Sequence, residues 1–141
     1  MKIDYKKLII FILVPLLLGA LVGLITVPNS NVNSIIPAWI FPIVWTILYI
    51  LMGISSYLVY RDSNEVPKIY IIQLVCNLLW SCIFFTFKLF IIAYIWILLL
   101  ILLVIIMIKE FIEVNKLAGY LQIPYLIWLC IASFLNLLII M

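Results

Sequence analysis

Three apolar segments carry Trp, Tyr, Asn and Gln side chains at helical spacing. In the clearest case, one stripe falls within an arc of about 80° when residues are placed on a helix, and it consists of Gln73, Asn77, Trp80, Phe84 and Lys88. Indole faces stack on flat apolar molecules, whereas amides and phenols orient a bound molecule through hydrogen bonds. The stripe therefore predicts a site for a flat, apolar, aromatic ligand.

Two further segments repeat the pattern. One carries Trp45, Tyr49, Met52, Gly53 and Ser56, and the other carries Tyr125, Trp128, Ala132 and Asn136. The structural alternative is that the amides only hydrogen-bond neighbouring helices and that the tryptophans form a belt at the lipid headgroups. Because Trp45, Trp80 and Trp128 are expected well inside the apolar segments, the belt explains them less well than a shared cavity.

Other chemistries lack their residues. The chain has no His, which excludes a His-ligated metal and a His general base. Cys76, Cys82 and Cys130 have no paired-ligand spacing and are interpreted as small buried apolar residues. No nucleophile with its base, carboxylate pair or phosphate loop is evident. We predict no metal and no required cofactor, and the net charge of +3 gives no reason to expect a nucleic-acid partner.

The elements that position these stripes are predicted to be membrane-spanning helices. Hydrophobic residues make up 70% of the 141 residues, charged residues make up 9%, and the mean hydropathy is +1.47. A soluble domain of this size could not cover so much apolar surface. Apolar runs long enough to cross a bilayer of about 30 Å predict an all-α bundle of five transmembrane helices in one domain, at about 8–27, 39–60, 69–87, 89–108 and 117–140. The fourth run has few polar residues and is expected to face mostly lipid.

Basic residues predict the orientation of the bundle. Seven of the eight would lie on one side of the membrane, and these are Lys2, Lys6, Lys7, Arg61, Lys68, Lys109 and Lys116. Only Lys88 would lie on the other side, so the N-terminus is expected in the cytoplasm, the C-terminus outside, and the loop at about 28–38 on the outer face. The first run is too long for a signal-peptide core, and it is predicted to remain as an anchor in what we expect to be a bacterial cell membrane. Gly19 and Gly23 have the GxxxG spacing of close helix contacts, either within the bundle or in a dimer.

The sequence also resembles a known family, the tryptophan-rich sensory proteins, also called translocator proteins or peripheral benzodiazepine receptors. The similar segments cover nearly the whole chain in order: Leu18-Gly19 with Gly23, Pro37 to Gly53, Gln73 to Trp80 with Phe84, Phe85 and Lys88, and Pro124 to Trp128 with Ala132, Leu135 and Asn136. The resemblance implies a five-helix bundle, often a homodimer, with a pocket beneath the first loop that binds porphyrins, haem-like tetrapyrroles and benzodiazepine-type ligands.

The resemblance also implies roles for particular residues. Trp45 and Trp128 match the family tryptophans implicated in light- and oxygen-dependent porphyrin breakdown, so they are the candidate catalytic residues. Positions in or around the pocket are matched by Trp39, Tyr49, Asn77, Trp80 and Tyr125. The chain departs from the family at Asn31 to Ser34, where a Lys-Pro-Ser-Trp run is usual, and at its end, which lacks the Tyr and basic residue of a cholesterol-recognition pattern. We therefore do not expect specific cholesterol binding.

Three functional hypotheses follow. The first is a membrane receptor or sensor for tetrapyrroles, with porphyrin or haem as ligand, whose pocket tryptophans would also support photo-oxidative degradation of the porphyrin. The second is a transporter of tetrapyrroles or other hydrophobic molecules, although the absence of charged residues from the apolar runs argues against ion coupling. The third is an interaction module whose stripes pack only against a partner membrane protein.

Overall fold

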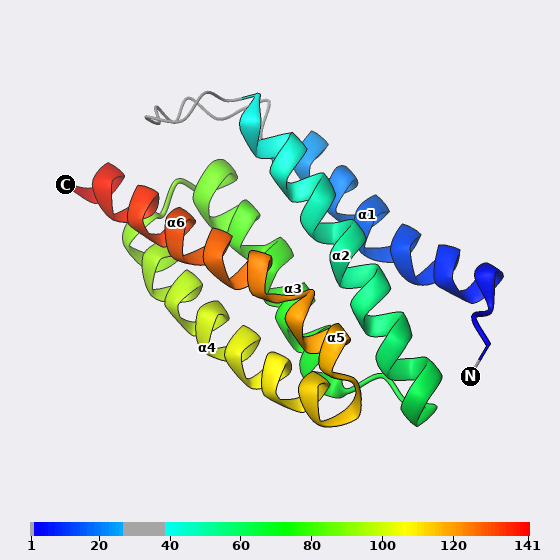
Figure 1. Ribbon diagram of the computed structural model, residues 1–141. Helices are drawn as coiled ribbons and strands as arrows, with labels where there is room; N and C mark the ends of the chain where they lie inside the picture. The colour runs from blue at the N-terminus through cyan, green and yellow to red at the C-terminus, as the bar shows by residue number, and fades with distance from the viewer. Residues whose placement is uncertain (1, 27–38) are drawn as a thin grey trace.

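The computed structural model describes residues 2–26 and 39–141, and in these residues helices joined by short connections are the only regular elements (Figure 1). The elements are α1 (Tyr5–Thr26), α2 (Ile40–Ser63), α3 (Lys68–Ser81), the π-helical segment η2 (Cys82–Thr86), α4 (Phe90–Val114), α5 (Lys116–Tyr120) and α6 (Ile123–Ile140). With η2 counted with α3, and α5 with α6, five helices in the described ranges are long and apolar enough to cross a membrane. The predicted fold class is confirmed.

The helix bounds differ from the predicted ones at the end of the chain. Helix α4 continues to Val114 through charged residues, and the predicted 117–140 segment is divided by a turn at Leu121 and Gln122. Asn115 begins the short helix α5 by accepting the Ala118 N–H at 3.2 Å, as N-cap residues do. Pro124 lies in the first turn of α6, where its missing N–H has no helical partner to lose.

Helix α4 supplies one side of the core. Six of its buried residues recur at intervals of three and four, and they are Ala93, Ile97, Leu100, Val104, Met107 and Phe111. This spacing places them on one face, which packs against α3, α5 and α6. The rest of α4 is largely exposed, in keeping with the predicted lipid-facing surface. Helix α1 is nevertheless the most exposed of the five spans, with only 6% of its most apolar stretch buried.

The connection between the third and fourth spans is irregular, as the predicted break near Lys88 anticipates. The Phe87 N–H donates to the Cys82 carbonyl at 3.1 Å, a hydrogen bond five residues apart that widens the helix into η2. Lys88 then adopts φ 52°, the left-handed region that residues other than Gly rarely enter. The chain reverses there without Gly or Pro and begins α4 at Phe90.

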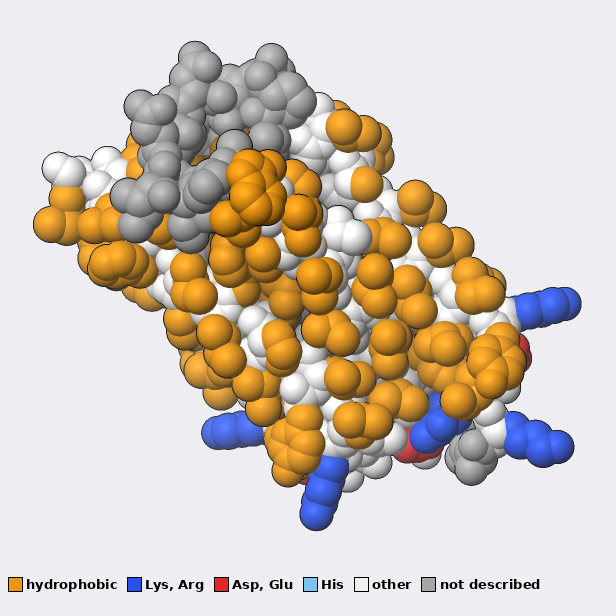
Figure 2. All heavy atoms as spheres, turned by 45° about the horizontal axis from the view of Figure 1, so that its top comes forward, with side chains coloured by type: hydrophobic (Ala, Val, Ile, Leu, Met, Phe, Trp, Pro, Cys, Tyr) orange, Lys and Arg blue, Asp and Glu red, His pale blue; other side chains and the backbone are white. Residues whose placement is uncertain are grey.

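Charged side chains gather at one end of the bundle. In Figure 2 the visible Lys and Arg side chains project from one end, while the length of the molecule is covered by apolar side chains. The seven basic residues predicted to share a side lie at the start of α1, the end of α2, the start of α3, the end of α4 and the start of α5. We call this the lysine-rich end, and Lys88 lies at the opposite end. The predicted loop at 28–38 lies outside the described residues.

Candidate functional site

Four predicted site residues form one hydrogen-bonded chain across three helices. The Tyr49 hydroxyl of α2 donates to Asn77 Oδ1 of α3 at 2.8 Å. Asn77 Nδ2 donates to the Tyr125 hydroxyl of α6 at 2.7 Å, and that hydroxyl donates to Gln73 Oε1 of α3 at 2.9 Å. All four side chains are buried, so each amide and phenol satisfies the others in a region that lipid could not solvate. We call this group the polar chain.

An aromatic cluster lies one helical turn closer to the end of the bundle that carries Lys88. The Trp45 indole stacks on the Tyr49 ring, with centroids 5.6 Å apart and planes 28° apart. It meets Tyr125 and Trp128 edge-on, with centroid distances of 6.3 and 6.5 Å, while Phe41 meets Trp128 at 5.8 Å. Trp45 and Trp128, the two candidate catalytic residues, are therefore in contact with each other rather than directed separately into lipid.

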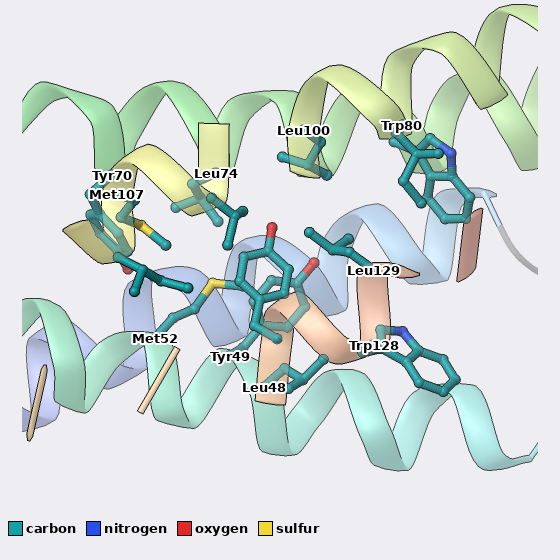
Figure 3. Packing of buried hydrophobic residues seen from close by; sticks show 14 of the residues in the cluster. Leu48, Tyr49, Met52, Tyr70, Leu74, Trp80, Leu100, Met107, Trp128 and Leu129 are labelled. Carbon is teal, nitrogen blue, oxygen red and sulfur yellow. The ribbon is translucent and has the colours of Figure 1, made fainter. Parts of the chain in front are cut away.

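Trp80 and Phe84 form a second aromatic group on the neighbouring helix. Their rings stack with centroids 4.9 Å apart, and Phe84 also meets Phe85 and Phe90 edge-on. Asn136 lies near the same end, where its Nδ2 donates to the Phe90 carbonyl at 3.0 Å. Figure 3 shows Trp80 and Trp128 together at one end of the core cluster, with Tyr70 and Met107 at the other.

Several buried polar atoms near Trp80 and Trp128 remain available to a bound molecule. Within the described ranges, neither indole N–H finds a hydrogen-bond acceptor, and Asn136 Oδ1 finds no donor. The two indoles are only 6% and 8% exposed. Buried polar groups of this kind are usually satisfied, so two donors and one acceptor at this end are the groups that a ligand could engage.

The position of Tyr49 depends on close packing between α1 and α2. A Cβ atom at Gly19 would collide with the Tyr49 ring, and one at Gly53 would collide with the backbone of Phe11 and Ile12, whereas one at Gly23 would meet nothing within 4 Å. Gly19 therefore allows close packing within the protomer, where it contacts Tyr49 of the polar chain. The predicted homodimer stays a prediction.

One predicted site residue does not join these groups. Trp39 precedes α2 and is 67% exposed, so it lies outside the polar chain and both aromatic groups, and its ligand contact stays a prediction. For Gln73 and Asn77 the structure matches the alternative drawn from the sequence, because Gln73 Oε1 accepts from α6 and Asn77 bonds both α2 and α6. A ligand that contacted them would have to exchange these hydrogen bonds for its own.

Sequence reasoning missed two buried polar residues that continue the stripes. Tyr70 lies one turn before Gln73 on α3, and Gln122 lies one turn before Tyr125 at the start of α6. Both are buried. Extending each stripe by one helical turn would have found them, since both lie inside the predicted spans 69–87 and 117–140. Trp96 was also left out of the site, and its indole donates to the Cys76 carbonyl at 2.9 Å, which joins α4 to α3.

The fold and site together define a class: a small all-α membrane protein whose helices enclose tryptophan, tyrosine and amide side chains near one end. Comparison with known proteins gives the particular family. The model of the TspO/MBR family matches residues 11–141, and the chain belongs to that family.

Individual relatives agree with this assignment. The chain is 39% identical over 106 residues to the tryptophan-rich protein TspO of Chlorobaculum tepidum, a match covering 71% of this chain and 67% of the relative. It is 35% identical over 102 residues to the tryptophan-rich sensory protein of Cereibacter sphaeroides, covering 71% and 65%. It is also 35% identical over 106 residues to protein CrtK of Rhodobacter capsulatus, covering 71% and 66%. The matched region thus spans about two thirds of the length of each relative.

Proposed function

We propose that this protein is a membrane receptor or sensor that binds porphyrins and related tetrapyrroles between α2, α3 and α6. The observation that supports this proposal most directly is the contact between Trp45 and Trp128 from separate helices. Indole rings offer large faces on which a flat macrocycle can stack. The indole N–H groups of Trp80 and Trp128, which lack acceptors within the described residues, provide donors for its polar atoms.

In this proposal the polar chain lies beneath the ligand rather than around it. Tyr49, Asn77, Tyr125 and Gln73 already satisfy one another, so they hold α2, α3 and α6 together while the tryptophans contact the macrocycle. The lysine-rich end would face the cytoplasm, in accordance with the charge asymmetry of membrane proteins. The site end of the bundle would then open toward the outer leaflet.

The proposal extends to photochemistry at Trp45 and Trp128. A porphyrin excited by light can take one electron from an easily oxidised indole in contact with it, which gives a porphyrin radical anion and an indole radical cation. Molecular oxygen then adds to the reduced macrocycle, and the oxygenated macrocycle returns one electron to the indole, so the tryptophan is restored and the net reaction is addition of O₂ to the porphyrin. No acid–base or nucleophilic group is needed for that step. Illumination of the porphyrin complex in air should therefore give a degradation product, and the rate should fall in Trp128→Phe and in samples without oxygen.

Binding is tested with the purified protein in lipid nanodiscs. Protoporphyrin IX is titrated in the dark, and binding is followed by its absorbance, because energy transfer can quench distant tryptophans and quenching alone does not report contact. We expect saturable binding that weakens by about two- to tenfold in Trp128→Phe, the equivalent of about 0.5–1.5 kcal/mol of aromatic contact. Trp96→Phe is the matched control, since this indole hydrogen-bonds Cys76 outside the cluster. Absence of saturable binding refutes the proposal.

Transport is distinguished by a separate measurement. A receptor binds the porphyrin without net movement, whereas a transporter carries it into sealed vesicles. Protein-dependent porphyrin accumulation inside the vesicles would replace the receptor proposal with the transporter alternative.

A further inference from the structure

A second polar site lies at the lysine-rich end of the bundle, away from the tryptophans. Gln122 is 0% exposed, and neither its side-chain Nε2 nor its Oε1 has a hydrogen-bond partner among residues 2–26 and 39–141. Its backbone is satisfied, because its N–H donates to the Gly119 carbonyl at 3.1 Å and its carbonyl accepts from the Leu126 N–H at 3.1 Å. The unmet requirement therefore belongs to the side-chain amide alone. Lipid cannot meet it.

Tyr70 lies at the same level of the bundle as Gln122. Helices α3 and α6 both begin at the lysine-rich end, and they touch where Tyr125 donates to Gln73. Tyr70 and Gln122 each precede that contact by one helical turn, so the register of two parallel helices brings them to one level. The Tyr70 hydroxyl is also buried and without a hydrogen-bond partner of good geometry in the described parts of the chain. In Figure 3 Tyr70 lies at the opposite end of the core from Trp80 and Trp128.

Ser56 of α2 supplies a third polar group, beside Tyr70. It is 0% exposed, its hydroxyl donates to the Gly53 carbonyl at 3.1 Å, and its oxygen can still accept a hydrogen bond close to the Tyr70 hydroxyl. The three side chains thus offer an amide NH₂, an amide oxygen and two hydroxyl groups. None of the three carries a charge, which suits a small neutral molecule that both donates and accepts hydrogen bonds.

We propose that Gln122, Tyr70 and Ser56 bind ordered water inside the bundle. Water is small, and it supplies donors and acceptors to buried polar groups that otherwise lack them. The site adjoins the polar chain, because Gln73 Nε2 donates to the Tyr70 carbonyl at 3.0 Å. Bound water extends that chain into a continuous polar column from Ser56 at the lysine-rich end to Tyr49 near the middle of the bundle.

The amide content of the chain makes the test direct. Gln73 and Gln122 are the only two glutamines in the sequence, so protein labelled with ¹⁵N-glutamine gives two side-chain NH₂ signals. In lipid nanodiscs we expect strong magnetisation transfer from water to the Gln122 NH₂ group, at least three times that to Gln73, which is bonded directly to protein. Gln122→Met assigns the signal by removing it. Transfer to Gln122 no stronger than to Gln73 overturns the proposal.

A pair of matched variants checks which hydroxyl holds the water. Tyr70→Phe removes one partner and should at least halve the water signal of Gln122 while leaving that of Gln73 unchanged. Tyr57→Phe is the control, since the Tyr57 hydroxyl also lies toward the lysine-rich end but accepts from the Asp4 N–H. Equal signals at Gln122 in the two variants would remove Tyr70 from the site and contradict the proposed geometry. The wild-type measurement decides whether water is bound even if a variant fails to fold.

Discussion

Replacing Tyr125 by Phe tests the polar chain with little change in shape. The Phe ring fills the same volume and keeps the edge contact with Trp45, now 6.3 Å between centroids. Only the hydroxyl is lost, and with it the hydrogen bond from Asn77 at 2.7 Å and the one to Gln73 at 2.9 Å. Tyr125 is 1% exposed, so external water cannot readily replace the hydroxyl.

The expected cost follows from these two hydrogen bonds. A hydrogen bond between membrane helices contributes about 0.6 kcal/mol on average and at most about 1.7 kcal/mol, so losing two costs about 1.2 kcal/mol at the average value. The variant also leaves Asn77 Nδ2 and Gln73 Oε1 unpaired, and a buried polar group without a partner costs about 1–3 kcal/mol when nothing relaxes. Partial relaxation places the total at about 1–3 kcal/mol.

The free energy of unfolding can be measured in bicelles by steric trapping. Tyr120→Phe is the matched control, because Tyr120 belongs to the neighbouring helix α5 but is 53% exposed, and it should change the free energy by less than about 0.5 kcal/mol. If Tyr125→Phe is as mild as this control, the polar chain does not stabilise the bundle and the reasoning fails.

Three further substitutions test other features of the fold by the same unfolding assay. Gly53→Ala should destabilise by about 1–3 kcal/mol, because its Cβ meets the α1 backbone, while Gly23→Ala, facing open space, should not; equal effects would refute the close approach of α1 and α2. Lys88→Gly should stabilise by about 1 kcal/mol by relieving the φ of 52°, and a similar gain in Lys88→Ala would assign the effect to the lost side chain instead. Asn115→Ala should cost about 1 kcal/mol, because the variant loses both the α5 cap and the 2.7 Å hydrogen bond from Asn115 to Asp62. Asn115→Asp keeps a capping oxygen but places a carboxylate against Asp62. If this second variant is as stable as the wild type, the contact with Asp62 does not stabilise the protein.

The sequence was sufficient for the fold because lipid imposes few solutions. Long apolar runs must be helices when no water is present to hydrogen-bond the backbone. Seven basic residues, which lie at alternating ends of successive helices, are enough to predict the direction in which each helix runs through the bundle. Helical periodicity also placed Asn77, Tyr125 and Trp45 on faces that meet. A 3.6-residue repeat specifies which side of a helix is polar, and in a small bundle the polar sides have only one another to face.

The partners within the site could not be predicted in the same way. Periodicity does not say whether Asn77 bonds a ligand or Tyr49, because that depends on distances of a few tenths of an ångström between helices. The π-helical segment that precedes Lys88 shifts the register of Phe84 and Phe85 relative to Trp80, and no Gly or Pro marks it. The turn between α5 and α6 was missed because it depends on the Asn115 cap and Pro124 together, neither of which alone specifies where the turn lies. Gln122 lies in that turn, inside a segment predicted as one continuous helix.

The central claim is that Trp45 and Trp128 contact a bound tetrapyrrole, and ¹⁹F NMR of protein containing 5-fluorotryptophan tests it most directly. The chain has five tryptophans, each assigned by its Phe variant, and the ring current of a stacked macrocycle shifts only nearby nuclei. Saturating protoporphyrin IX in the dark should shift the Trp45 and Trp128 signals most. The signal of Trp96, whose indole hydrogen-bonds the Cys76 carbonyl outside the aromatic cluster, should shift by less than its ligand-free linewidth. Unchanged Trp45 and Trp128 signals under saturating porphyrin would contradict the account.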